Sequence, residues 1–124
     1  MHEFSNQKPL YIQLKEIIEL SILNGLLKSE EAVPSIRILS KDYQLNPLTV
    51  SSAIDSLVND GILYKKRGIG MFVSPDAKEK IQKQQIGYFR TNELISTIKK
   101  ARSLGMVIDE IEEIITDIFK QEEQ

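Results

Sequence analysis

The sequence predicts a mainly α-helical fold with a small β-hairpin, and three observations support this class. Apolar side chains recur at helical spacing in six segments of the 124-residue chain. Two of these segments are short and are joined by a tight turn, which is the layout of a helix-turn-helix. A β-prone stretch with two glycines follows directly, as expected of a hairpin.

The first helix is expected to begin after Pro9 and to end at Asn24 and Gly25. Proline is favoured at helix starts and glycine just past helix ends. Apolar residues recur at spacings of three and four, so they share one face, which we expect to lie in the core. These residues are Leu10, Leu14, Ile17, Ile18 and Ile22.

A short second helix is expected after Pro34. Ser35 is a good N-cap residue, because its hydroxyl can accept a hydrogen bond from a backbone N–H of the first turn. The helix then runs to Tyr43 and is interrupted at Gln44 and Leu45. The side chains expected to face the core are Ile36, Leu39 and Tyr43.

A third helix has a strong start signal at Asn46 and Pro47 and a stop at Asp60 and Gly61. Its expected core face consists of Val50, Ala53, Ile54, Leu57 and Val58. The opposite face has no large apolar side chain after Leu48 and consists of short polar residues. They are Thr49, Ser51, Ser52, Asp55 and Ser56.

The hairpin is expected between Ile62 and Ser74, with its turn in the sequence KKRGIGMFV. Glycines beside cations can bind phosphate, but a dinucleotide-binding loop would need a third glycine where Val73 stands. No Walker A motif is present either. Two interpretations remain, a solvated turn and a turn that contacts the phosphates of a nucleic-acid backbone.

Three further helices are expected from Asp76 onward. In the first, Gly87 predicts a break or kink. Its inward side chains are expected to be Ala77, Ile81 and Ile86. The next helix carries Leu94, Ile95, Ile98 and Ala101 and ends at Leu104 and Gly105.

The last helix carries an apolar stripe that is too wide for a two-helix tail to cover by itself. We therefore expect it to pack against a second copy of the chain across a two-fold axis. The stripe consists of Ile111, Ile114, Ile115, Ile118 and Phe119.

Composition argues against several classes of function. The chain has no cysteine, and its single histidine is His2, so thiolate and multi-histidine metal sites are not expected. We expect no enzyme, no cofactor and no metal. The N-terminal sequence lacks the layout of a signal peptide, and no apolar run could span a membrane, which favours the cytoplasm.

Charge is distributed unevenly along the chain. Residues 61–102 carry 10 basic and 3 acidic side chains, whereas residues 1–60 have a net charge of −3 and residues 103–124 one of −6. A basic segment between acidic ones can be the footprint of a polyanionic partner. The alternative for Lys78, Lys80 and Lys83 is that they only solvate a helix face.

The run PSIRILSKDYQLNPLTVSSAIDSLVNDGILYKKRGIGMFV, residues 34–73, resembles the DNA-binding domain of GntR-family bacterial transcription regulators. It has the Pro-Ser-x-Arg, x-Thr-Val, Gly-Ile and Gly-x-Gly-x-Phe-Val elements in order. The Asn-Pro-x-Thr-Val turn and the short helical tail resemble the YtrA subfamily. Pro47 and Ser51 stand where other branches often have basic residues, and Val107 stands where a capping serine is usual.

The resemblance implies a winged helix-turn-helix domain over residues 1–75 and a helical dimerisation segment over residues 76–124. It implies a sequence-specific transcription regulator, a repressor, that binds a near-palindromic double-stranded DNA operator as a homodimer. The residues expected to contact DNA are Ser35, Arg37, Asn46, Leu48, Thr49, Ser51, Ser52, Lys65, Lys66, Arg67 and Gly68.

Some alternatives remain open from the sequence. Thr49 could be a second helix cap, and Arg37 could form a surface ion pair with Asp42. A winged-helix adaptor that binds proteins and has lost DNA binding is the alternative function. The basic hairpin and the polar face of the third helix favour DNA, because an adaptor would more often present apolar residues there.

Overall fold

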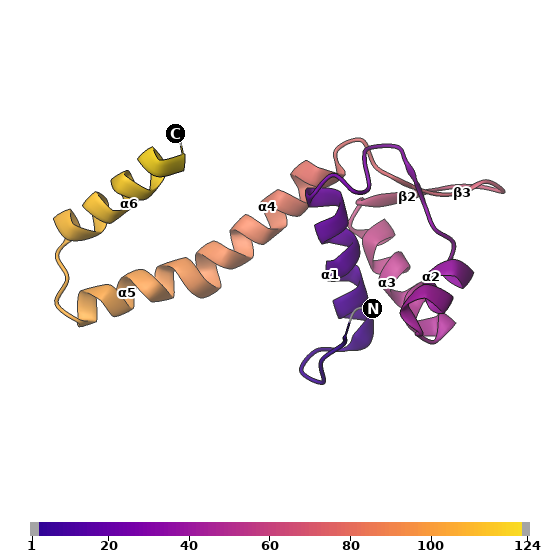
Figure 1. The fold of residues 1–124 in the computed structure, drawn as a ribbon, viewed down its shortest axis with the longest axis horizontal. Helices are drawn as coiled ribbons and strands as arrows, with labels where there is room; N and C mark the ends of the chain where they lie inside the picture. Colours follow the sequence, from indigo (N-terminus) through magenta and orange to yellow (C-terminus); the bar gives the residue numbers. More distant parts are fainter. Residues whose placement is uncertain (1–2, 123–124) are drawn as a thin grey trace. The chain divides into compact units, whose positions relative to one another are not determined.

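The computed structural model describes residues 3–122 and divides into two compact units, one up to Gln84 and the other from Gln85 onward (Figure 1). The elements of the first unit are α1 (Leu10–Leu23), β1 (Ala32–Val33), α2 (Ile36–Tyr43), α3 (Pro47–Asn59), β2 (Leu63–Lys66) and β3 (Gly70–Val73). The remaining elements are α4 (Ala77–Phe89), the π-helical segment η1 (Arg90–Leu94), α5 (Ile95–Ser103) and α6 (Ile108–Glu122). The predicted fold class, mainly helical with a small sheet in a winged helix-turn-helix, is confirmed.

One hydrophobic core holds the first unit together. It is formed where α1 packs on α3 and where both meet the sheet and the start of α4. Each such side chain removed from water contributes about 1.5–3 kcal/mol. The fully buried large side chains are Leu14, Val50, Ile54, Leu57, Ile62, Leu63, Val73 and Ile81.

The sheet has three antiparallel strands in the order β1-β3-β2. In the hairpin, Tyr64 lies opposite Phe72 and Lys66 opposite Gly70. Gly68 has φ +77°, a left-handed conformation that glycine adopts without a steric penalty. The third strand, β1, was not predicted from the sequence, because two residues are too few to show an alternating pattern.

The first unit extends into α4, because Ala77 and Ile81 are buried in its core. The expected burial of Ile86 was wrong, since it is 54% exposed. The expected break at Gly87 was also wrong. The helix runs through Gly87 to Phe89, and the irregularity comes later, as the π-helical segment η1.

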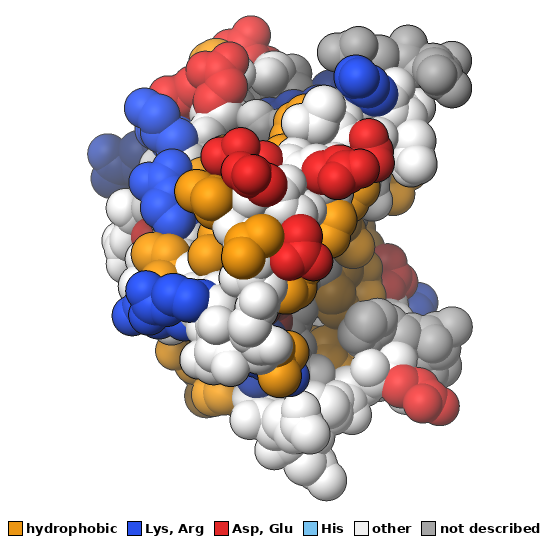
Figure 2. Space-filling view, turned by 90° about the vertical axis from the view of Figure 1, so that its left-hand side faces the viewer, with side chains coloured by type: hydrophobic (Ala, Val, Ile, Leu, Met, Phe, Trp, Pro, Cys, Tyr) orange, Lys and Arg blue, Asp and Glu red, His pale blue; other side chains and the backbone are white. Residues whose placement is uncertain are grey.

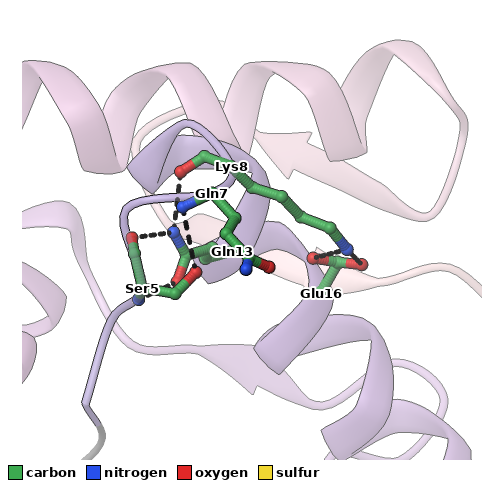
Figure 3. Close-up of polar contacts among 5 residues, drawn as sticks. All are labelled: Ser5, Gln7, Lys8, Gln13 and Glu16. Atoms are coloured by element: carbon green, nitrogen blue, oxygen red, sulfur yellow. Dashed lines mark hydrogen bonds and ion pairs between the residues drawn. The ribbon is translucent and has the colours of Figure 1, made fainter.

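Residues 5–8 are held against the start of α1 by the buried Gln13 (Figure 3). Its Oε1 accepts from the Ser5 N–H at 2.9 Å, and its Nε2 donates to the carbonyls of Ser5 at 2.8 Å and Lys8 at 2.7 Å. Lys8 also pairs with Glu16 at 3.0 Å. These contacts fix the chain where it enters α1.

Candidate nucleic-acid interface

The N-terminal turn of α3 is capped as the sequence predicts. Asn46 Oδ1 accepts from the Leu48 N–H at 2.8 Å, and Pro47 occupies the first turn, where no N–H is needed. The cap uses the amide oxygen of Asn46, and no described residue accepts from its NH₂ group. Asn46 therefore positions the helix and retains donors toward solvent.

The hydroxyls on the exposed face of α3 differ in what they can offer a ligand. Ser52 Oγ donates to the Leu48 carbonyl at 3.0 Å, so its oxygen is left as an acceptor. Among the hydrogen bonds of residues 3–122, none uses the hydroxyl of Thr49 or Ser51, and both side chains are half-buried. The cap of α3 is thus made by Asn46 and not by Thr49.

A surface concavity of about 330 Å³ joins this face of α3 to the start of α1. Its lining residues are Leu10, Tyr11, Leu48, Thr49 and Ser52. Leu10 was predicted to be in the core, but it is 42% exposed because it lies on the first turn of α1, beyond the packed part of that helix. Helical spacing alone cannot reveal that Leu10 is exposed. Tyr11 was not predicted as a lining residue, because it lies outside the apolar stripe of the helix.

A second concavity, of about 550 Å³, lies between the start of α2 and the hairpin tip. Ser35 and Arg37 line it from α2, and Ile69 and Gly70 line it from the hairpin. Ser35 Oγ accepts from the Ile38 N–H at 3.2 Å, as expected of an N-cap. Arg37 forms no ion pair with Asp42 or with any other described residue, so its guanidinium is available.

The three cations of the hairpin are not equivalent. Lys65 lies 3.8 Å from Asp55 of α3, and the ammonium of Lys66 lies 4.5 Å from the centroid of the Phe72 ring. Arg67 has no polar partner among residues 3–122 and is exposed at the turn. Gly68 follows it and carries no side chain that could block an approach to this turn.

The apolar stripe of α6 is largely exposed within the second unit. Ile114, Ile115, Ile118 and Phe119 are 49%, 48%, 51% and 68% exposed, while Ile111 is half-buried. Between α5 and α6 the surface forms an apolar concavity of about 420 Å³ that includes Ile98, Ile111 and Ile115. Figure 2 shows apolar side chains at the surface among basic and acidic ones.

The sequence-predicted site residues therefore fall into three groups in the structure. Leu48, Thr49 and Ser52 share the first concavity, and Ser35 and Arg37 share the second. The residues that line neither are Asn46, Ser51, Lys65, Lys66, Arg67 and Gly68. Hydroxyls, an amide and free guanidinium groups can hydrogen-bond phosphates and base edges. Within residues 3–122 no carboxylate or histidine cluster suits a metal ion, and no helix is long and apolar enough to cross a membrane.

Comparison with protein families places the matched region over this same unit. The family described as "Bacterial regulatory proteins, gntR family" matches residues 10–73. The chain is 38% identical over 84 residues to the arabinose metabolism transcriptional repressor of Geobacillus stearothermophilus, covering 67% of this chain and 23% of that protein. It is 29% identical over 110 residues to the HTH-type transcriptional repressor YtrA of Bacillus subtilis, covering 89% of this chain and 84% of YtrA.

Solved structures agree with the sequence comparison. A transcriptional regulator of the GntR family from Bacteroides thetaiotaomicron is 31% identical with a TM-score of 0.76, covering 91% of this chain and 98% of that one. The DNA-binding domain of AraR in complex with operator ORX1 is 31% identical with a TM-score of 0.54, covering 60% of this chain and 90% of that one. The chain thus spans about a quarter of the arabinose repressor and most of YtrA.

Proposed function

Because this chain belongs to the GntR family of bacterial regulatory proteins, we propose that it is a sequence-specific, DNA-binding transcription regulator. It acts in the cytoplasm as a repressor, binding a near-palindromic operator as a homodimer. The arabinose repressor and YtrA, both similar in sequence, are transcriptional repressors, and the similar AraR domain binds operator DNA. The likeness to YtrA extends over the C-terminal helices as well.

The exposed N-terminal face of α3 is the observation that carries this proposal. A helix with its side chains is about 10 Å across and fits the major groove, which is roughly 12 Å wide. Thr49, Ser51 and Ser52 are short, so the backbone of α3 can approach the base edges closely. The Ser52 oxygen is left as an acceptor and suits the amino group of adenine or cytosine.

The remaining polar groups hold the helix in register on the DNA backbone. Arg37 has a free planar guanidinium, which can bind a phosphate or a guanine edge with two parallel hydrogen bonds. Arg67 is the cation of the hairpin turn without a partner among the described residues, and it contacts the phosphates or the minor groove. Lys65 and Lys66 lie on β2, just before Arg67, and they add to the positive electrostatic potential of the hairpin.

Two copies of the chain are joined through α6. The stripe of α6 leaves four large apolar side chains exposed in a single chain, whereas a second copy would remove them from water. A two-fold axis relates two recognition helices, which matches a near-palindromic operator. We propose a functional division at residue 75, with DNA binding before it and dimerisation after it, while the start of α4 up to Gln84 belongs to the first compact unit.

The test is to select the preferred duplex from a random pool and to titrate it against a scrambled duplex at one salt concentration. DNA upstream of the protein's own gene is included as a candidate operator. Wild type is expected to prefer the selected duplex clearly. Thr49→Ala with Ser52→Ala should leave the melting temperature and the dimer unchanged. The difference in binding free energy between the selected and the scrambled duplex should fall by about 1–3 kcal/mol for each base-edge hydrogen bond removed.

Ser21→Ala is the matched control. Ser21 Oγ donates to the Ile17 carbonyl at 3.0 Å, the same bond that Ser52 makes to Leu48, but on α1. This variant should keep the full preference for the selected duplex. If no duplex is enriched and wild type binds all DNA equally weakly, the regulator is ruled out and the protein–protein adaptor takes its place.

A further inference from the structure

Leu48 is a strongly exposed apolar side chain of α3, at 77%, and it lies on the face proposed to enter the major groove. The core contacts of α3 are made by Val50, Ala53, Ile54 and Leu57, so folding does not require a leucine here. Its backbone is fixed by two bonds, one from its N–H to Asn46 and one from Ser52 to its carbonyl. The backbone of Leu48 is therefore held in place, and its side chain is left to water.

A second leucine lies in the same concavity. Leu10, on the first turn of α1, is 42% exposed and lines the concavity of about 330 Å³ together with Leu48. The Gln13 contacts to residues 5–8 fix the start of α1. Leu10, which forms one side of the concavity, is therefore held in position. Two apolar side chains thus flank the hydroxyl-bearing part of α3.

A leucine side chain cannot hydrogen-bond, so it can distinguish bases only by an apolar contact. In the major groove the C5-methyl group of thymine is the apolar feature that separates thymine from the other bases. We propose that Leu48, with Leu10 as a second wall, contacts the C5-methyl group of one thymine in each operator half-site. This assignment rests on the proposed function and adds a specificity-determining residue to it.

The neighbouring hydroxyl fits this assignment. Ser52 lines the same concavity and presents an acceptor, because its proton is bonded to the Leu48 carbonyl. An acceptor suits the exocyclic amino group of adenine or cytosine and does not suit the two major-groove acceptors of guanine. The concavity therefore selects a thymine methyl beside a base that carries an amino group.

Replacing thymine by deoxyuridine tests the contact, because it removes the methyl group and keeps the base pair. Each thymine of the selected duplex is replaced in turn, and wild type is titrated against each product. At one position in each half-site the affinity is expected to fall about fourfold, which corresponds to the roughly 0.8 kcal/mol of one buried CH₂ group. Leu48→Ala should bind the thymine and uracil duplexes alike at that position, and Leu10→Ala should lose part of the discrimination.

Leu26→Ala is the control, since Leu26 is 76% exposed, almost as much as Leu48, but follows the other end of α1. It should keep the fourfold effect, and melting curves should show all three variants folded. Wild type that is indifferent to every uracil, or Leu48→Ala that still discriminates, overturns the methyl contact while DNA binding stands. Failure to select any duplex overturns the proposed function and this contact together.

Discussion

Lys65, Lys66 and Arg67 carry the same charge but differ in what surrounds them. Lys65 lies near a carboxylate and Lys66 lies against an aromatic ring, whereas Arg67 has no polar partner in the described part of the chain. The sequence predicts a basic hairpin turn, but it cannot show which cation is engaged within the fold. This difference decides which substitution should alter binding most.

Arg67→Ala is expected to weaken binding to every duplex. Removing one cation from the phosphate backbone should reduce the slope of log affinity against log salt by about one unit. Titrations at several salt concentrations measure this slope. Lys83→Ala, an exposed cation on α4, is the control and should leave the slope unchanged. Equal slopes together with equal affinities for wild type and Arg67→Ala would mean that the hairpin is only a solvated turn.

Glu19 gives a prediction about pH. It is 8% exposed, and burial raises its pKa above the usual 4.5, assisted by Asp60 and Glu16 and opposed by Lys15. A raised pKa means that the folded state holds the proton more tightly, so the charged carboxylate destabilises the fold at neutral pH. Glu19→Gln should therefore raise the melting temperature at pH 7.

The rise in melting temperature caused by Glu19→Gln should become smaller as the pH falls through the raised pKa of Glu19 toward 4.5. Below that pH the carboxyl group is protonated in both the folded and the unfolded state, so replacing it no longer removes a buried charge. Thermal melts across this range measure it. Glu113→Gln is the control, because Glu113 is exposed on α6 and is not among the groups that shift the pKa of Glu19. A gain that is independent of pH would show that shape, and not charge, accounts for the change.

At the scale of elements, α4 is bonded to the chain just after the end of α3. Lys80 Nζ donates to the Gly61 carbonyl at 3.2 Å and lies 3.4 Å from Asp76. Gly61 has φ +76°, and a Cβ there would lie 2.6 Å from that ammonium group. Two constraints therefore coincide at Gly61, a left-handed backbone and a close cation.

Gly61→Ala and Gly25→Ala separate these two constraints. Gly25 has φ +80° with nothing within 4 Å of an added Cβ, so alanine there meets only the backbone penalty of about 1–2 kcal/mol. Gly61→Ala should lower the free energy of unfolding by about 0.2–1 kcal/mol more than Gly25→Ala does, because the added Cβ displaces the partly exposed ammonium group of Lys80. Urea unfolding of both variants compares them. Equal losses would show that the Lys80 contact contributes nothing.

The elements also show what sequence patterns can and cannot predict. The helices of the first unit were predicted because capping residues such as Ser35 and Asn46 are local signals, and both caps are formed. The strand β1 was not predicted, because it forms only by pairing with β3, which lies far away in the sequence. The π-helical segment η1 was not predicted, because it has no characteristic spacing of apolar residues. At the start of α6, Glu110 Oε1 accepts from the Val107 N–H at 3.1 Å, a contact that the sequence pattern did not predict.

The candidate site was also predictable only in part, because local patterns reveal one helix face but not its distant neighbours. The polar face of α3 can be read from helical spacing, but its neighbours Leu10 and Tyr11 come from a helix more than thirty residues earlier. Only the packing of α1 on α3 brings them together. The roles of all these residues in binding DNA remain predictions.

At the scale of the whole molecule, the prediction concerns assembly. Ile114→Asp with Ile118→Asp places two charges on the exposed stripe of α6 and should give monomers in analytical ultracentrifugation. Binding to the near-palindromic operator should weaken as well, because two linked binding modules become one. Leu20→Asp with Leu26→Asp, two exposed leucines of the first unit, should remain dimeric. If the Ile114 and Ile118 variant stays dimeric, the interface lies elsewhere.

The central position of β3 determines how much conformational entropy the hairpin still has to lose on binding. β3 is paired on both sides, by β1 and β2, and the Val73 N–H also bonds to the Glu31 carbonyl at 3.0 Å. Ordering a backbone residue costs about 1–2 kcal/mol, and for the paired residues this cost is met when the protein folds. The turn between Lys66 and Gly70 is itself closed by a bond from the Ile69 N–H to the Lys66 carbonyl at 2.9 Å, so a hairpin that contacts DNA as proposed would do so largely preorganised.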